Sequence, residues 1–222
     1  MMGFFSRLFN KSEQKESSQM ADVNLAVIYY SSTGINYQMA KWAEEAGKEA
    51  GANVKVVKVP ELAPEEAIAS NPAWKEHYEA TKDVPEATSD DIEWADAMLF
   101  SMPTRFGNLP AQMKQFLDSQ GGLWANGKTV NKVVSGMTSA QNPHGGQEAT
   151  VQSLYTSMAH WGAIIVPPGY SDQSIFAGGG NPYGTSATQG EDGKIAGDGV
   201  EGAVKHQAKR LVDVATLVKN GQ

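Results

Sequence analysis

The stretch Leu25-Ala-Val-Ile-Tyr-Tyr30, followed at once by Ser31-Ser-Thr-Gly-Ile-Asn36, decides the fold of this chain. Its first half is a short apolar run rich in β-forming side chains, which is typical of a parallel strand buried on both faces. Its second half leads into a helical pattern, because apolar side chains then repeat at steps of three and four residues up to Gly51. The stretch therefore predicts a strand, a short loop and an amphipathic helix.

The same alternation continues along the chain. Further apolar runs predict strands at residues 54–59, 97–102, 130–137 and 163–166, and helical periodicity predicts helices at 35–50, 89–94, 109–117, 151–158 and 204–218. Right-handed crossovers between such strands leave little choice other than a parallel sheet with helices on both faces. The sequence thus predicts one α/β domain with a five-stranded parallel sheet over residues 23–222.

Composition narrows the kind of chemistry. The chain has 222 residues, which one core can serve, and its formal net charge of −7 disfavours a nucleic-acid partner. No apolar run reaches the roughly 18 residues of a membrane span, so a cytoplasmic location is expected. The absence of cysteine excludes thiolate chemistry and disulfides, and the four histidines lack the paired spacing of a zinc site. We therefore expect no metal and a borrowed organic cofactor.

The first 22 residues differ from the rest. An aromatic cluster from Phe4 to Phe9 precedes a polar tract, and neither matches a signal peptide. Residues 1–22 are predicted to be a disordered extension, with a short anchor for a membrane or a partner as the alternative.

The loop after the first strand has the composition of a phosphate cradle. In parallel sheets, ligands bind beyond the carboxyl ends of the strands, where the strand order reverses. The loop supplies hydroxyls, a flexible glycine and free N–H groups at a positive helix end. Its candidate residues are Ser31, Ser32, Thr33, Gly34, Ile35 and Asn36. No Lys or Arg follows before Ala40, which argues against a P-loop, and a capped helix start is the alternative.

The loop after the third strand suits a flat ring. An aromatic side chain directly after a strand end cannot point into the sheet core, and a neighbouring glycine lets backbone approach a ring edge. The candidate residues are Thr104, Arg105, Phe106, Gly107 and Asn108. Arg105 taken alone is equally compatible with an ordinary surface position.

The loop after the fourth strand again combines hydroxyls, amides and glycine near a helix start, in Ser139, Ala140, Gln141, Asn142, His144 and Gly145. Trp124 lies in a predicted loop, where a core role is hard to arrange. His160 ends the next helix and could face the same crevice, although histidine is also favoured electrostatically at helix C-termini. Gly197–Gly202 matches G-x-G-x-x-G, but no strand is predicted to precede it, so it is interpreted as a loop.

Taken together, these loops resemble the WrbA family of flavodoxin-like quinone reductases. The resemblance rests on Tyr29-Tyr-Ser31, Pro103-Thr-Arg-Phe-Gly-Asn108, Gly121-Gly-Leu-Trp124, Gly145-Gly-Gln-Glu148 and Pro182-Tyr-Gly184, and it extends from about Asn24 to the C-terminus. It implies a flavodoxin-like doubly wound fold, FMN as cofactor, NADH or NADPH as co-substrate, and a homotetramer.

The resemblance also implies roles for the candidate residues. FMN phosphate would lie on Ser31–Asn36, and the isoalloxazine would lie between Thr104–Asn108 and Ser139–Gly145. Trp124, Phe106 and Thr33 would contact substrate, although the family usually carries an aromatic residue where Thr33 stands. His160 would lie near the flavin and, with Trp124, assist catalysis.

The expected activity is two-electron reduction of a small-molecule quinone by NAD(P)H in a ping-pong cycle. A flavodoxin that carries single electrons to protein partners is one alternative, and a scaffold or regulatory protein that has lost the chemistry is another. Trp124 and the long glycine-rich segment from Gly178 to Gly199 favour an enclosed pocket, and the phosphate loop argues against an idle site.

Overall fold

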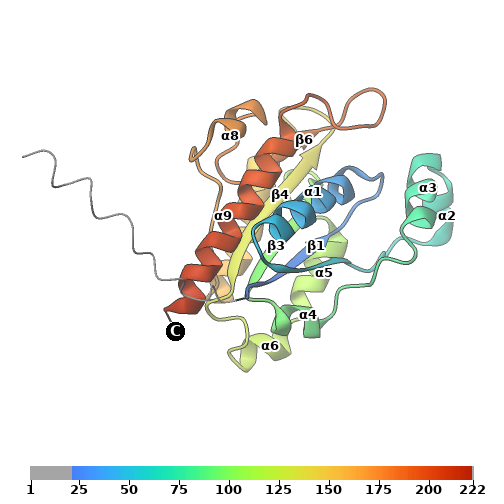
Figure 1. Cartoon of the computed structure of the whole chain (residues 1–222). Helices are drawn as coiled ribbons and strands as arrows, with labels where there is room; N and C mark the ends of the chain where they lie inside the picture. The colour runs from blue at the N-terminus through green and yellow to red at the C-terminus, as the bar shows by residue number, and fades with distance from the viewer. Residues whose placement is uncertain (1–21, 222) are drawn as a thin grey trace, which may run out of the picture.

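The computed structural model describes residues 22–221, in which helices cover both faces of a six-stranded sheet (Figure 1). The extension predicted for residues 1–22 lies outside the described residues, apart from Asp22. The strand order β2-β1-β3-β4-β5, parallel throughout, confirms the doubly wound sheet. A sixth strand, β6 (Ser186–Thr188), was not predicted and pairs with the last three residues of β4.

The remaining strands are β1 (Asn24–Tyr29), β2 (Asn53–Lys58), β3 (Ala97–Pro103), β4 (Val133–Ala140) and β5 (Ile164–Ile165). The helices are α1 (Ile35–Glu49), α2 (Glu65–Ala69), α3 (Pro72–Ala80), α4 (Ser89–Trp94), α5 (Ala111–Asp118), α6 (Gly121–Ala125), α7 (Gln147–His160), α8 (Gln173–Ala177) and α9 (Val200–Asn220). No helix within residues 22–221 combines the length and the apolar character of a membrane span.

The core has two halves, one on each face of the sheet. Strand β1 shows how one sequence serves both, because Leu25 and Val27 pack under α1 and α9 whereas Ala26 and Ile28 face α4, α5 and α7. This alternation buries β1 almost completely, as its apolar run predicted. The loop after β1 is therefore attached to a strand that is buried on both faces.

Two predicted segments are corrected by the structure. Strand β4 begins at Val133 rather than at residue 130, because Asn131 adopts a left-handed conformation (φ 63°) and Val130 is exposed. Strand β4 also extends further than predicted at its other end, so Ser139 and Ala140 are its last residues instead of lying in the loop. The connection between β2 and β3 also contains two short helices that the sequence did not predict, α2 and α3, and the Asn71 side chain caps α3.

Candidate functional site

A cavity of about 600 Å³ lies at the carboxyl edge of the sheet, where the loops after β1, β3 and β4 converge. It brings together most of the predicted cofactor residues: Ser31, Ser32, Thr33, Ile35, Asn36, Thr104, Arg105, Phe106, Ser139, Ala140, Gln141, Asn142 and Gly145. Gly34, Gly107, Asn108 and His144 belong to the same loops without lining this cavity. Strand order reverses between β1 and β3, so the cavity lies at the topological switch point.

The phosphate loop is built around Gly34. Its φ of +98° lies in the left-handed region, and its N–H donates to Ser31 Oγ at 3.0 Å. Helix α1 begins at the next residue, so the N–H groups of its first turn have no acceptors within the helix. Those donors and the positive helix end are suited to an anion, although the loop itself carries no basic side chain.

Asn36 ties the phosphate loop to the two neighbouring strands. It is 1% exposed, and its amide Nδ2 donates to Ser101 Oγ at 3.2 Å. Ser139 Oγ donates to Asn36 Oδ1 at 2.6 Å, and Ser101 Oγ donates to the Asn36 carbonyl at 3.1 Å. Both ends of the Asn36 amide are thus engaged within the protein, so its side chain fixes the geometry of the loop.

The loop after β3 forms a tight turn that projects an aromatic ring. Arg105 and Asn108 exchange backbone hydrogen bonds of 2.9 and 3.0 Å, which places Phe106 at φ 53° and leaves its side chain fully exposed. Thr104 Oγ1 accepts the Gly107 N–H at 3.2 Å and stiffens the turn. A positive φ at a bulky residue is strained, and such strain is typical of functional sites.

Arg105 connects the two loops across the cavity rim. Its Nη2 donates to Ser32 Oγ at 3.1 Å, and its Nη1 donates to the Thr104 carbonyl at 3.1 Å. Among the described residues that line the cavity, it is the only cation. It stands where it can meet an anionic group without entering the phosphate loop.

Apart from Pro103 at the end of β3, which adjoins the predicted Thr104, three lining residues were missed by sequence reasoning: Asn71, which caps α3, Trp74 on α3, and Gln189 after β6. A carboxylate holds α3 in place, because Glu61 accepts hydrogen bonds from Trp74 Nε1 at 3.2 Å and from Tyr30 Oη at 3.0 Å. Burial raises the pKa of Tyr30, so its hydroxyl stays protonated and donates. The polar sequence around these residues gave no sign that they approach the site.

His77 on α3 lies behind the phosphate loop. A Cβ added to Gly34 would lie 3.6 Å from its Nδ1, and its ring centroid is 5.5 Å from that of Tyr37. Burial, assisted by the nearby Lys58 cation, lowers the pKa of His77. The folded protein therefore favours a neutral imidazole beside the loop.

The structure places Trp124 and His160 together, but away from the cavity. Trp124 lies on the short helix α6, where the sequence predicted a loop, and it is 56% exposed. Its Nε1 donates to the His160 carbonyl at 2.9 Å. Helix α7 starts beside the cavity and runs back for 14 residues, about 21 Å, before it ends at His160. Figure 1 shows α6 at the end of the sheet opposite β6. Neither residue lines the cavity of its own chain.

The residues present fit FMN. The cavity offers a cradle of N–H groups and hydroxyls for a phosphate, and a polar cleft with a projecting aromatic ring for a flat heterocycle. A Cβ on Gly146 would lie 2.6 Å from Gly107 Cα, so the two loops expected to hold the ring already touch. Within residues 22–221, no group of three His, Asp or Glu side chains forms a metal site.

Comparison with known proteins agrees with this geometry. Residues 23–175 match the family model described as NADPH-dependent FMN reductase. The fold resembles the crystal structure of a flavodoxin, WrbA-like protein from Agrobacterium tumefaciens, with a TM-score of 0.60 and 19% identity over 90% of this chain and 100% of that one. A Megasphaera elsdenii flavodoxin gives a TM-score of 0.53 with 17% identity over 85% and 98% of the two chains. Fold and site together define a flavodoxin-like FMN protein.

Two sequence relatives narrow this class. A Deinococcus radiodurans protein named NAD(P)H dehydrogenase (quinone) is 52% identical over 87% of this chain and 96% of its own. A Paracoccus denitrificans protein of the same name is 40% identical over 91% and 98%. This chain belongs to the NAD(P)H dehydrogenase (quinone) family.

Removing the Asn36 amide should weaken the site from within. In Asn36→Ala, the buried hydroxyls of Ser101 and Ser139 lose partners, so the free energy of unfolding of the apoprotein should fall by about 1–3 kcal/mol. Urea denaturation measures this, with Gln38→Ala, on the exposed side of the same helix, as the control. Equal stability of the two variants would show that the buried bonds do not hold the loop.

The lowered pKa of His77 predicts an acid-side loss of stability. The unfolded chain takes up this proton near pH 6.5, whereas the folded protein takes it up only at lower pH. The free energy of unfolding should therefore fall as the pH decreases from about 7 toward that lowered pKa, and the dependence should be weaker in His77→Phe, which keeps a ring against Tyr37. Urea denaturation across this range gives the difference between the two proteins, and a difference independent of pH would refute the assignment.

Proposed function

We propose that this protein is an FMN-dependent NAD(P)H:quinone oxidoreductase with a ping-pong cycle, and that residues 23–222 form its FMN-binding domain. FMN held in this cavity would supply the two-electron chemistry: a hydride would come from NAD(P)H, and after NAD(P)⁺ leaves both electrons would go to a quinone. With one proton from solvent, the products are NAD(P)⁺ and the hydroquinone. The observation that carries the proposal is the convergence of three loops on one cavity in a chain 52% identical to a protein named NAD(P)H dehydrogenase (quinone).

The residues of this chain would bind and orient the reactants. The phosphate would lie against the N–H groups of residues 33–36, whose hold is electrostatic and directional. Thr104 and Gly145 would line the ring edge, on two loops that touch each other at Gly107 and Gly146. Phe106 would cover the open side of the cavity and exclude water. The nicotinamide and then the quinone would stack there in turn.

We further propose that the site is completed by a second copy of the chain, within a homotetramer. Trp124 and His160 lie at the far edge of the sheet in their own chain, so their proposed roles require a partner subunit that brings them to the candidate FMN cavity. Exposed aromatic residues at Trp124, Tyr170 and Phe176 supply apolar surface for subunit contacts. In that setting His160 would stabilise or protonate the reduced quinone oxygen, and Trp124 would confine the quinone ring. The cytoplasm, which supplies NAD(P)H, is the proposed location.

The activity is tested by anaerobic turnover of the FMN-loaded protein. We expect NAD(P)H to bleach the flavin, and one equivalent of added quinone to restore its colour with release of one hydroquinone. Initial rates at varied concentrations of both substrates should give parallel double-reciprocal lines, because one product leaves before the second substrate enters. A flavin that passes electrons only to a protein acceptor, with no quinone turnover, would support the carrier alternative instead.

The role of Trp124 across subunits is tested by complementation. Trp124→Ala should lower kcat/KM for the quinone by about tenfold, because an aromatic wall is lost, while FMN stays bound. Thr33→Glu places a carboxylate in the phosphate loop and should abolish FMN binding. Refolding the two variants together should give more activity than their sum, since mixed tetramers contain complete sites.

The control for this mixture is each variant refolded alone under the same conditions. No gain in the mixture, or full activity of Trp124→Ala by itself, would contradict the proposed contribution from a partner subunit.

A further inference from the structure

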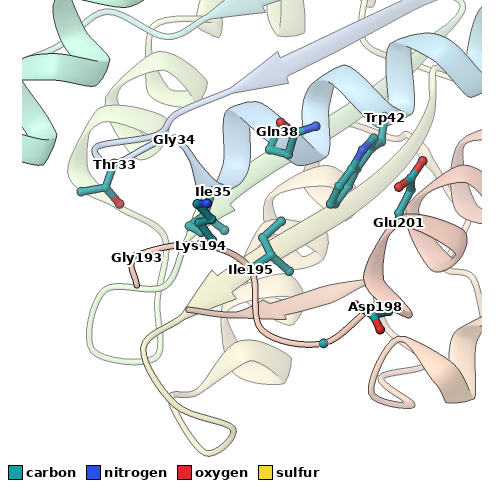
Figure 2. Close-up of a pocket in the computed structure, with 11 residues that line it drawn as sticks. Thr33, Gly34, Ile35, Gln38, Trp42, Gly193, Lys194, Ile195, Asp198 and Glu201 are labelled. Atoms are coloured by element: carbon teal, nitrogen blue, oxygen red, sulfur yellow. The ribbon is translucent and has the colours of Figure 1, made fainter. Parts of the chain in front are cut away.

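A second cavity, of about 720 Å³, lies on the other side of the phosphate loop (Figure 2). Three segments form it: the start of α1, the loop after β6, and the first turn of α9. It includes part of the Gly197–Gly202 pattern, and β6 ends nine residues before Gly197, so a strand does precede that pattern although not directly. The sequence assigned this segment no function.

The second cavity adjoins the first cavity, the candidate FMN site, which we call the flavin cavity. Thr33 and Ile35 line both of them. Gln189 lines the flavin cavity, and its side-chain amide donates to the carbonyl of Gly193, on the wall of the second cavity, at 3.2 Å. A ligand that reaches the flavin can therefore extend over the shared rim into the second cavity.

The walls of the second cavity suit a flat ring. Trp42 is half-buried, and it lines the cavity with Ile35 and Ile195, all three belonging to or packing against the same core cluster. Figure 2 shows Trp42 projecting from α1 toward the loop that carries Ile195, with Glu201 beside the indole. An indole opposite an aliphatic side chain gives a planar base a stacking surface and an apolar cover.

The polar groups suit a ribose more than a phosphate. Asp198 and Glu201 present two carboxylates at the end next to α9, and Lys194 supplies a cation. Glu201 is held by an ion pair of 2.7 Å with Lys205, which also pairs with Glu45 at 2.7 Å. A carboxylate that accepts from ribose hydroxyls selects NAD, whereas an arginine accommodates the 2′-phosphate of NADP. No arginine is among the residues that line this cavity.

We propose that the second cavity holds the adenosine half of NADH, with the base against Trp42 and the ribose hydroxyls toward Asp198 and Glu201. The coenzyme would pass over Thr33 to bring its nicotinamide to the flavin. The enzyme would then prefer NADH to NADPH, because a 2′-phosphate would meet two carboxylates, Asp198 and Glu201, against one lining cation, Lys194. This assignment rests on the proposed function and adds the coenzyme that the site selects.

The test uses the FMN-loaded protein and ADP-ribose, which lacks the nicotinamide. Calorimetry should detect ADP-ribose binding to the wild type, and Trp42→Ala should weaken it about tenfold. The same variant should raise the KM for NADH about tenfold, while kcat at saturating NADH and FMN affinity stay unchanged. Trp94→Ala, which truncates another half-buried indole on α4, is the control and should leave ADP-ribose affinity unchanged.

Two further variants keep the test decisive. Trp42→Leu preserves an apolar side chain against the core and should show the same loss if Trp42→Ala does not fold. Asp198→Arg should raise the ratio of kcat/KM for NADPH to that for NADH at least about tenfold. Neither substitution touches the flavin cavity.

The outcomes separate this inference from the proposed function. Quinone turnover with unchanged ADP-ribose affinity and unchanged NADH KM in Trp42→Leu would overturn the adenosine site and leave the activity standing. ADP-ribose binding that depends on Trp42 in a protein without quinone turnover would support the site and refute the proposed activity. A wild type that prefers NADPH would overturn the proposed selectivity.

Discussion

The buried amide of Asn36 is the constraint on which the rest of the site depends. It lies at the start of α1, and its hydrogen bonds reach Ser101 in β3 and Ser139 at the end of β4. Since β1 leads directly into this helix, one side chain fixes the phosphate loop relative to the two strands whose loops would hold the ring. A buried amide with both ends bonded is rigid, because breaking either bond leaves a polar group unpaired.

Around Asn36, the candidate phosphate site contains few basic side chains. The chain carries a net charge of −7, and the phosphate loop offers N–H groups and a helix end in place of lysine. Arg105 spans the rim, where its guanidinium bonds Ser32 and the Thr104 carbonyl. The α2–α3 segment closes the remaining side, held through Glu61 by Trp74 and Tyr30. A neutral, directional cradle suits a cofactor that must stay bound while charged substrates enter and leave.

The sequence predicted the sheet and most of the cavity because both follow from local pattern. Buried parallel strands appear as apolar runs, and the switch-point rule names the loops to search, which is why Ser31–Asn36 and Thr104–Phe106 were found. Trp74 was missed because α3 is held in place by the Asn71 cap and by a hydrogen bond to Glu61, which lies far from it in sequence. Gln189 was missed because β6, which precedes it, is only three residues long. His160 was expected near the crevice because helical periodicity does not show toward which edge of the sheet a helix runs. A helix that returns from a parallel strand must end at the amino edge, and its 14 residues take it there.

We propose above all that the loop held in place by Asn36 binds the phosphate of the cofactor. The most direct measurement is the dissociation constant of the apoprotein for FMN and for riboflavin, which differ only in that phosphate. Charge-assisted hydrogen bonds at the helix end should make FMN bind at least about a hundredfold more tightly. Asn36→Ala should reduce the ratio of the riboflavin and FMN dissociation constants, because the loop is then held less firmly. Equal affinities of the wild type for FMN and riboflavin would contradict the account.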